Sequence, residues 1–348
     1  MKRSIFLVFL TVLITVSVFS QANLQPAATV NLIRTESITV GQLRSNVERL
    51  EKAGGRPLTA EERRQVLDVM INERLVLQAA ERDRVIVTDN ELNSHMQQLR
   101  GILAQNIGRQ PTDAEFAQAV MNEFGMEVPA FRDELRKQMI SEKYLMNKKG
   151  TQIEASIRIP TDAEILAEYN LAKPQLVRPE TVRFSMIQVP YGPDAASRTR
   201  ARETANRLAT EIGSNPSRFD EVVARSITPN SGYQAGDFGY LPRIPEARTA
   251  VGQPLMDAAF SLRQGQVSSL IEGSQGFNII KVTENYAQKN LELDDIFQLG
   301  SNITVRDYIG QAMLNERQQT AVTRASEELI AELRTNRSFQ VFENNLNW

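Results

Sequence analysis

Thr181-Val-Arg-Phe-Ser-Met-Ile-Gln-Val189 opens the stretch that decides the fold, which continues through Ala235-Gly-Asp-Phe-Gly239 to Gly276-Phe-Asn-Ile-Ile-Lys-Val282. Polar and apolar residues alternate in the first segment, which predicts a strand with one buried face, and the last segment predicts a closing strand. Between them lie helical patterns at 195–212, about 219–225 and 254–262, and a glycine-rich loop at 232–239. Strands at both ends with helices between them predict a small α+β domain with a mixed or antiparallel sheet.

Five blocks of this region resemble, in order, the parvulin (PpiC-type) family of peptidyl-prolyl isomerases. They are Val182-Arg-Phe-Ser-Met-Ile-Gln-Val189, Phe219-Asp-Glu-Val-Val-Ala-Arg-Ser226, Ala235-Gly-Asp-Phe-Gly239, Met256-Asp-Ala-Ala-Phe-Ser-Leu262 with Gly265-Gln-Val-Ser268, and Gly276-Phe-Asn-Ile-Ile-Lys-Val282. A lone Gly-Asp-Phe-Gly would usually mark only a turn, but five blocks in order over about a hundred residues are specific. The resemblance implies a parvulin-like domain at 179–286.

The polar positions that the parvulin family associates with turnover have changed in this chain. Met186 and Asn278 stand where the family has histidines, and its acidic or cysteine position falls on Thr228. Methionine and asparagine can pack or hydrogen-bond, but neither changes protonation near neutral pH as histidine does. We therefore assign no catalytic residue, and we expect the isomerase activity to be weak or lost.

The apolar slot for the proline ring is better preserved than the polar positions. The resemblance places Leu241, Leu255 and Phe260 in its walls, with Phe238 nearby, as the substrate-binding residues. Phe238 and Phe260 could equally be ordinary core residues of an α+β domain. Asp237 has glycine neighbours, which favours a carboxylate that caps the loop over an acid catalyst.

Residues 59–170 are predicted to be mainly helical. Thr-x-x-Glu capping boxes, which satisfy free N–H groups at a helix start, occur at Thr59–Glu62, Thr88–Glu91, Thr112–Glu115 and Thr161–Glu164. The helix after Thr112 should end at Gly125. Leu67, Ile71 and Leu75 lie at helical spacing and require a packing partner.

Residues 28–145 resemble the N-terminal domain of the SurA/PrsA/PpiD class of exported chaperones. Arg64-Gln-Val-Leu-Asp-Val-Met-Ile-Asn-Glu-Arg-Leu-Val-Leu-Gln-Ala-Ala80 carries the resemblance most strongly. In that class a C-terminal helix and short strand complete the N-terminal domain. We therefore expect a long helix at 303–334, followed by pairing of Phe339–Phe342 with the strand near Val30–Ile33.

Taken together, these patterns predict an α+β multidomain protein. A mainly helical SurA-like chaperone domain, completed by the C-terminal helix, carries one small parvulin-like α+β domain. The expected segments are a signal peptide at 1–22, the N-terminal helical domain at 23–160, a connecting helix and linker at 161–178, the parvulin-like domain at 179–286 and a C-terminal segment at 287–348 that packs on the N-terminal domain.

Composition excludes several classes of function. The 40 Lys and Arg residues against 42 Asp and Glu lack the basic excess that nucleic acid requires, so no nucleic-acid partner is expected. The chain has no cysteine, which excludes disulfides and thiol nucleophiles. Its single histidine, His95, lies in a helical pattern and is expected to be a solvated helix residue, so Ser/His/Asp triads and zinc sites built on several histidines are excluded as well. We expect no metal and no cofactor.

The N-terminus has the layout of a secretory signal peptide. Met1-Lys-Arg3 precedes the apolar run 5–19 and the small-residue site Ser20-Gln-Ala22. The run is shorter than the roughly 20 residues that span a bilayer, which disfavours a retained anchor. We expect a periplasmic protein without stable membrane insertion once the signal peptide is removed. Whether the signal peptide is cleaved after Ala22 or retained stays open.

Both resemblances imply an ATP-independent periplasmic chaperone or foldase, since the chain also lacks a phosphate-cradling Gly-rich Lys motif. Its partners would be unfolded or extended exported polypeptides, with outer-membrane protein precursors among the candidates. Two alternatives stay open: an active prolyl isomerase, and a structural protein of envelope assembly.

Overall fold

The structure is a computed structural model that describes residues 23–228, 231–335 and 337–348. The signal peptide expected at 1–22 lies outside the described residues. The chain divides into two compact units, Met1–Arg158 with Glu316–Trp348, and Ile159–Asn315. Among the described residues, no helix combines the length and apolar character needed to cross a membrane.

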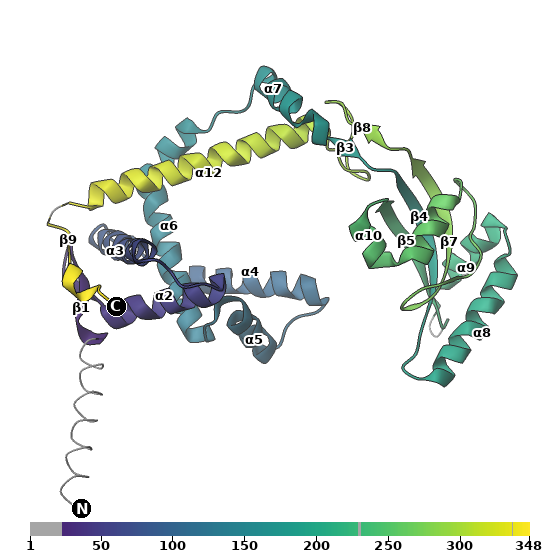
Figure 1. The fold of residues 1–348 in the computed structure, drawn as a ribbon, viewed down its shortest axis with the longest axis horizontal. Coiled ribbons are helices and arrows are strands. Elements are labelled where there is room, and N and C mark those ends of the chain that lie inside the picture. The colour runs from purple at the N-terminus through teal and green to yellow at the C-terminus, as the bar shows by residue number, and fades with distance from the viewer. Residues whose placement is uncertain (1–22, 229–230, 336) are drawn as a thin grey trace, which may run out of the picture. The chain divides into compact units, whose positions relative to one another are not determined.

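The first unit contains a three-stranded antiparallel sheet in the order β2-β1-β9. A hairpin joins β1 (Pro26–Asn31) to β2 (Thr35–Thr39), and β9 (Phe339–Val341) pairs with the other edge of β1. Figure 1 shows these two segments, from opposite ends of the chain, side by side. The predicted pairing is confirmed, with a register centred on Thr29 opposite Gln340.

Five helices follow the hairpin in the first unit. They are α2 (Val40–Gly54), α3 (Ala60–Arg82), α4 (Asp89–Ile107), α5 (Asp113–Phe124) and α6 (Val128–Ser156). The predicted boxes at Thr59, Thr88 and Thr112 start α3, α4 and α5, and α5 ends at Gly125 with a left-handed φ of 66°. A further box, Thr39 with Gln42, starts α2.

Two apolar clusters hold the first unit together. One joins the sheet to α2, α3 and the end of α12 (Val305–Leu333), and includes Leu67, Ile71, Leu75 and Leu329. The other joins α4, α5 and α6 through residues such as Phe116 and Phe131. The C-terminal helix and strand therefore complete the core of the N-terminal domain, as the α+β multidomain prediction required.

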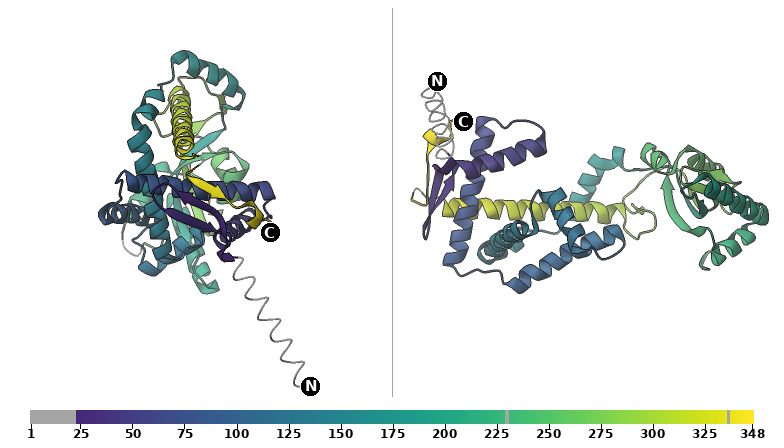
Figure 2. Two further views of the ribbon diagram at one scale, coloured as in Figure 1. Left: turned by 90° about the vertical axis from the view of Figure 1, so that its left-hand side faces the viewer. Right: turned by 90° about the horizontal axis from the view of Figure 1, so that it is seen from below.

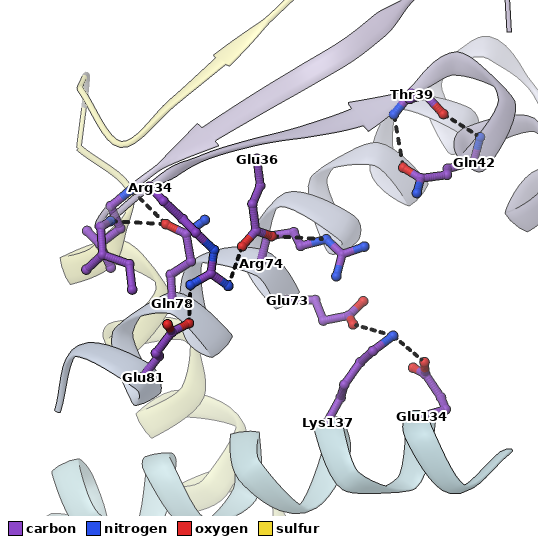
Figure 3. A network of polar contacts seen from close by, with 12 residues as sticks. Arg34, Glu36, Thr39, Gln42, Glu73, Arg74, Gln78, Glu81, Glu134 and Lys137 are labelled. Atoms are coloured by element: carbon purple, nitrogen blue, oxygen red, sulfur yellow. Dashed lines mark hydrogen bonds and ion pairs between the residues drawn. The ribbon is translucent and has the colours of Figure 1, made fainter. Parts of the chain in front are cut away.

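Gln78 on α3 fixes the hairpin to the helix (Figure 3). Its Oε1 accepts hydrogen bonds from the amides of Leu32 at 2.9 Å and Ile33 at 3.1 Å, and the side chain is only 1% exposed. Around it, Arg34 forms ion pairs with Glu36, at 2.7 Å, and with Glu81. The turn between β1 and β2 thus has its free backbone donors paired by a helix side chain.

The second unit is built on an antiparallel sheet in the order β5-β4-β7-β6. Its strands are β4 (Thr181–Pro190), β5 (Gln234–Pro242), β6 (Ile271–Glu272) and β7 (Gly276–Tyr286). Alternate residues of β4 enter two different cores. Ile187 and Val189 pack against α8 (Ala195–Ile212) and α9 (Pro216–Arg225), whereas Val182 and Phe184 pack against α10 (Pro245–Val251) and α11 (Gln253–Ser261). The sheet, seen from two further directions in Figure 2, is thus covered by helices on both faces.

The glycine-rich segment 232–239 is not the loop that its composition suggests. From Gln234 onward it is strand β5, hydrogen-bonded to β4. The register shifts between Phe184 and Ser185, where the β5 partners step from Gly239 to Asp237. Gly239 has a φ of 91°, a value that costs glycine little and permits the bulge. Here pairing with a neighbouring strand overrides the local turn signal.

A third cluster occupies the end of the second unit where the chain enters and leaves it. Helix α7 (Asp162–Ala172) starts at the predicted Thr161 box, and β3 (Val177–Arg178) pairs with β8 (Lys289–Asn290). The Tyr169 hydroxyl donates to the Leu291 carbonyl at 3.2 Å. The first turns of α12 pack here through Val305 and Ile309, so residues 287–315 lie with the second unit and 316–348 with the first.

Candidate functional site

The candidate site lies on the face of the sheet that α10 and α11 cover. Met186 stands between Gly236 of β5 and Ile280 of β7, and it packs partly buried against the apolar cluster of that face. The same cluster contains Leu241, Leu255 and Phe260. The structure therefore brings together Met186 and the three predicted wall residues.

The wall residues differ in how far a ligand could reach them. Leu241 and Leu255 are 3% and 5% exposed, so both serve the core of the domain. Phe260 is partly buried, and the Arg243 guanidinium lies 4.6 Å from its ring centroid. These three side chains therefore belong to the packed interior beside the site, and a bound ligand could contact little of their surface.

Phe238 is the accessible member of the group. It is 41% exposed, and its ring stacks on buried Phe184 with centroids 4.6 Å apart and planes 11° apart. Phe238 lies at the bulge, between Asp237 opposite Ser185 and Gly239 opposite Phe184. The bulge thus aims an aromatic ring outward while the stack fixes its orientation.

Asn278 occupies the buried polar position of the site. It lies opposite Gln188 of β4 and Ile271 of β6, and it is 5% exposed. Its Nδ2 makes only a long contact of 3.5 Å with the Gly276 carbonyl, and its Oδ1 has no protein donor. Gly273 leaves room for the amide, since a Cβ there would stand 2.8 Å from Nδ2.

Thr228 lies elsewhere. It sits in the exposed turn that follows α9, where its amide donates to the Arg225 carbonyl and its own carbonyl accepts from the Ser231 amide, at 3.1 and 3.2 Å. Helix α9 packs on the face of the sheet opposite α11. Of the three changed polar positions, Met186 and Asn278 therefore share a face, while Thr228 belongs to an outer turn.

An ion-pair network links β4 to β5 and β7 near the start of β4. Arg183 pairs with Asp237 at 2.6 Å and with Glu284 at 2.9 Å. The Arg183 guanidinium lowers the pKa of Asp237, and the carboxylate also accepts from the Gly239 amide at 3.1 Å. A hydrogen bond from Tyr286 to Glu284 raises the pKa of Tyr286 to about 12. Asp237 is thus a charged residue that fixes the bulge rather than a proton donor.

This network was not predicted from the sequence. Arg183 and Glu284 are cross-strand partners of opposite charge, a pairing that stabilises sheets, but the register is needed to see it. Within the described residues, no group of three or more His, Asp or Glu side chains is placed to hold a metal ion.

Family comparisons assign both parts of the chain. Residues 1–145 match the SurA-like N-terminal domain, and residues 160–297 match the PPIC-type PPIASE domain. The chain carries a SurA-like N-terminal domain and a PPIC-type domain. The family resemblances inferred from the two sets of motifs are therefore confirmed.

Similar proteins carry chaperone and foldase names. The SurA-like chain is 26% identical over 277 residues to Chaperone SurA of Alcanivorax borkumensis, covering 77% of this chain and 60% of that protein. It is 23% identical over 286 residues to Foldase protein PrsA of Clostridium botulinum, covering 81% and 75%. The SurA of Chromohalobacter salexigens is 25% identical, with 49% of its length covered. The chain thus spans about half to three-fifths of these SurA relatives.

Solved structures show weaker likeness over the whole chain. One of two SurA-like chaperones of Campylobacter jejuni matches with a TM-score of 0.32 and 16% identity, covering 88% of this chain and 99% of that one. PrsA from Bacillus subtilis matches with a TM-score of 0.28 and 19% identity, covering 86% and 90%.

Proposed function

We propose that this SurA-like protein is an ATP-independent chaperone that binds unfolded or extended polypeptides, and that its PPIC-type domain holds peptide segments with little or no prolyl isomerisation. The chaperone part of the proposal rests on the match to the SurA-like N-terminal domain and on relatives named chaperone and foldase. We propose further that the protein is exported to the periplasm, that its clients are exported chains, including outer-membrane protein precursors, and that no nucleotide takes part.

The peptide-holding role rests mainly on one contrast: the apolar side chains of the site are present, whereas its two family histidines are replaced by residues that do not titrate. Exposed Phe238 stacks on buried Phe184, and Met186 packs in the cluster below. An aromatic ring held at a fixed angle offers an apolar ligand contact area at little further cost in side-chain entropy. This surface suits a proline ring or another apolar side chain of a bound segment.

Catalysis would need more than this surface. The barrier to peptide-bond rotation is about 18–20 kcal/mol, and only groups that stabilise the twisted amide more than both planar forms lower it. At the two changed strand positions the chain presents the thioether of Met186 and the neutral amide of Asn278, neither of which titrates. These side chains can contact a planar peptide bond, but they cannot form a network of ionisable groups with pKa values suited to catalysis.

Suppression of client aggregation tests the chaperone role. The mature chain, residues 23–348, is mixed with a chemically unfolded model client and no nucleotide, and light scattering is followed. We expect suppression that rises with the ratio of chaperone to client. Equal aggregation with and without an excess of the protein contradicts the proposal.

Active isomerisation is the second candidate, because residues 160–297 match the PPIC-type PPIASE domain. A protease-coupled assay on a proline peptide compares the wild type with Phe238→Ala, which removes an exposed ring, and with Ile227→Ala, an 89% exposed control in the turn after α9. Turnover that Phe238→Ala abolishes and Ile227→Ala retains establishes the isomerase. Rates equal to the uncatalysed rate in all three support the holding role.

A further inference from the structure

The α5–α6 corner, residues 121–128, exposes apolar side chains that the core of the first unit leaves uncovered. Phe124, in the last turn of α5, is 46% exposed, and Met121, one turn earlier, is 41% exposed. Gly125 ends the helix directly after Phe124, and Met126 and Val128 follow as partly buried residues. Local sequence alone therefore brings four apolar side chains together where α5 turns into α6.

The Phe124 ring is held in place from within the unit. Its centroid lies 4.7 Å from that of Phe131, with 30° between the two planes, and Phe131 is only 7% exposed. A ring that is already fixed by stacking loses little further side-chain entropy when a ligand packs against it. Met121 and Met126 precede and follow it, and methionine adapts its shape to different partners. A fixed aromatic ring between adaptable side chains suits apolar ligands of varied shape.

The stretch 113–134, which contains the corner, is strongly acidic. Its only basic residue is Arg132, and its carboxylates belong to Asp113, Glu115, Glu123, Glu127, Asp133 and Glu134. The whole chain is nearly balanced, with 40 Lys and Arg against 42 Asp and Glu. The acidic excess is therefore a local property of α5 and the start of α6.

Two of these carboxylates stand unpaired in the corner itself. Asp113, Glu115 and Glu134 each form an ion pair with an arginine or lysine. Glu123 and Glu127 are exposed, and neither has an ion-pair partner in the part of the chain that the structure describes. Glu127 is also the N-cap of α6, yet its side chain makes no capping hydrogen bond. Both carboxylates are thus available to a cation from outside.

We propose that the α5–α6 corner binds segments of unfolded polypeptides in which Lys or Arg stands beside an aromatic or aliphatic residue. The apolar residue packs on Phe124 and the methionines, while the long stem of the cationic residue lies along the apolar surface and brings its charge to Glu123 and Glu127. The same carboxylates repel segments rich in Asp and Glu, so the corner selects by charge. This inference rests on the proposed chaperone function and names a class of client segment for the first unit.

A second copy of the chain fits this surface less well. A symmetric dimer would place the same patch of both copies face to face, and it would bring Glu123 and Glu127 against their own equivalents. Like charges brought together without cations oppose association. The charge of the corner therefore favours a basic polypeptide segment as its occupant.

Three labelled peptides of one length test the charge selection. Each has the same apolar centre of one aromatic and two aliphatic residues, flanked by two lysines, two glutamines or two glutamates. Fluorescence anisotropy with a protein of residues 23–348 measures their affinities. We expect the lysine peptide to bind about fivefold more tightly than the glutamine peptide, and the glutamate peptide to bind most weakly. The differences should shrink at high salt, because exposed charges are screened.

Variants locate the selection. Glu123→Gln combined with Glu127→Gln removes both charges at nearly constant size and should abolish the preference for the lysine peptide. Glu203→Gln combined with Glu221→Gln changes the net charge equally at exposed positions of α8 and α9, and it should retain the preference. Phe124→Ala should weaken binding of the lysine and glutamine peptides alike. Circular dichroism verifies that each variant is folded, and the first double variant alone suffices for the test.

The outcomes separate this inference from the chaperone proposal. Equal affinities of the three peptides, or a lysine preference that survives in the Glu123→Gln and Glu127→Gln variant, overturn the inference while suppression of client aggregation still supports the chaperone. Failure of the wild type to suppress aggregation contradicts the proposed function itself. A dimer in sedimentation that Phe124→Ala dissociates assigns the corner to self-association and also overturns the inference.

Discussion

Asn278 lies directly opposite Gln188 in the β4–β7 ladder, so two neutral amides face each other at the buried end of the candidate site. Asn278 is 5% exposed and its Oδ1 has no protein donor, while the nearby apolar cluster includes Met186. Neither amide can gain or lose a proton between pH 5 and 8. Peptide binding at this site should therefore be nearly independent of pH over that range, as peptide titrations at several pH values will measure.

Phe238 and Phe184 form a stacked pair with separable roles. Phe184 is fully buried, so Phe184→Ala should destabilise the PPIC-type domain by about 3–5 kcal/mol. Phe238 is 41% exposed, and Phe238→Ala should cost only the stack, about 0.5–1.5 kcal/mol, while it weakens peptide binding. Urea denaturation and peptide titration of both variants measure the two effects. A Phe238→Ala protein that binds peptide as the wild type does would place the binding surface elsewhere.

Gln78 should be one of the most sensitive polar residues of the first unit. Gln78→Met preserves its length but leaves the amides of Leu32 and Ile33 without their acceptor. A buried unpaired donor costs about 1–3 kcal/mol, so the loss of both bonds should lower the free energy of unfolding by at least that amount. Gln65→Met, at an exposed position of the same helix, is the matched control and should change stability little. Equal stability of the two variants in denaturant titrations would be inconsistent with this role.

Acid should weaken the first unit through its capping boxes. Hydrogen bonds from Arg56 to Glu62, from Lys143 to Glu91 and from Arg109 to Glu115 lower the pKa of each carboxyl from 4.5 to about 2. Because these pKa values are lower in the folded state, the stabilisation is complete above pH 4.5 and is lost as the pH falls toward about 2.

Replacing all three glutamates by glutamine tests this dependence, since glutamine retains the capping geometry without the charge. The melting temperature of the triple variant should fall less between pH 4.5 and 2 than that of the wild type. Thermal denaturation across this range, followed by circular dichroism, gives both slopes. Parallel slopes would assign the acid sensitivity to other carboxylates.

Arg334 connects the end of α12 to α3. Its Nη2 pairs with Asp68 at 2.6 Å, its Nη1 donates to Asn72 at 2.7 Å, and its guanidinium lies over Phe339, 4.5 Å from the ring centroid. Because these contacts are partly buried and use several groups at once, Arg334→Gln should destabilise the first unit by about 1–2 kcal/mol. Arg324→Gln removes only an exposed i,i+4 pair with Glu328, worth about 0.2–0.5 kcal/mol. Chemical denaturation should rank the two variants in that order.

Local signals in the sequence predicted the helices well. The four boxes that begin at Thr59, Thr88, Thr112 and Thr161 all form, because a capping box needs residues only three positions apart. Strand β5 could not be predicted in the same way. Its glycines favour a turn locally, and only hydrogen bonding to β4, about fifty residues earlier, makes it a strand. The missed contacts are those between distant parts of the chain.

The candidate site was predictable to a similar extent. The family resemblance singled out Met186 and Asn278, and the structure has them on the adjacent strands β4 and β7. The accessibility of Phe238 depends on the bulge, and the separation of Thr228 depends on the side of the sheet that α9 covers. Neither feature follows from residue type or spacing.

Exchange NMR on a proline-containing peptide tests the central claim most directly, because one experiment reports both binding and turnover. With a protein of residues 23–348 present, we predict that the cis and trans signals of the peptide shift or broaden as it binds, and that no cis–trans exchange cross-peaks appear. Exchange cross-peaks that are present with the wild type and absent with Phe238→Ala would contradict the claim and establish an active isomerase.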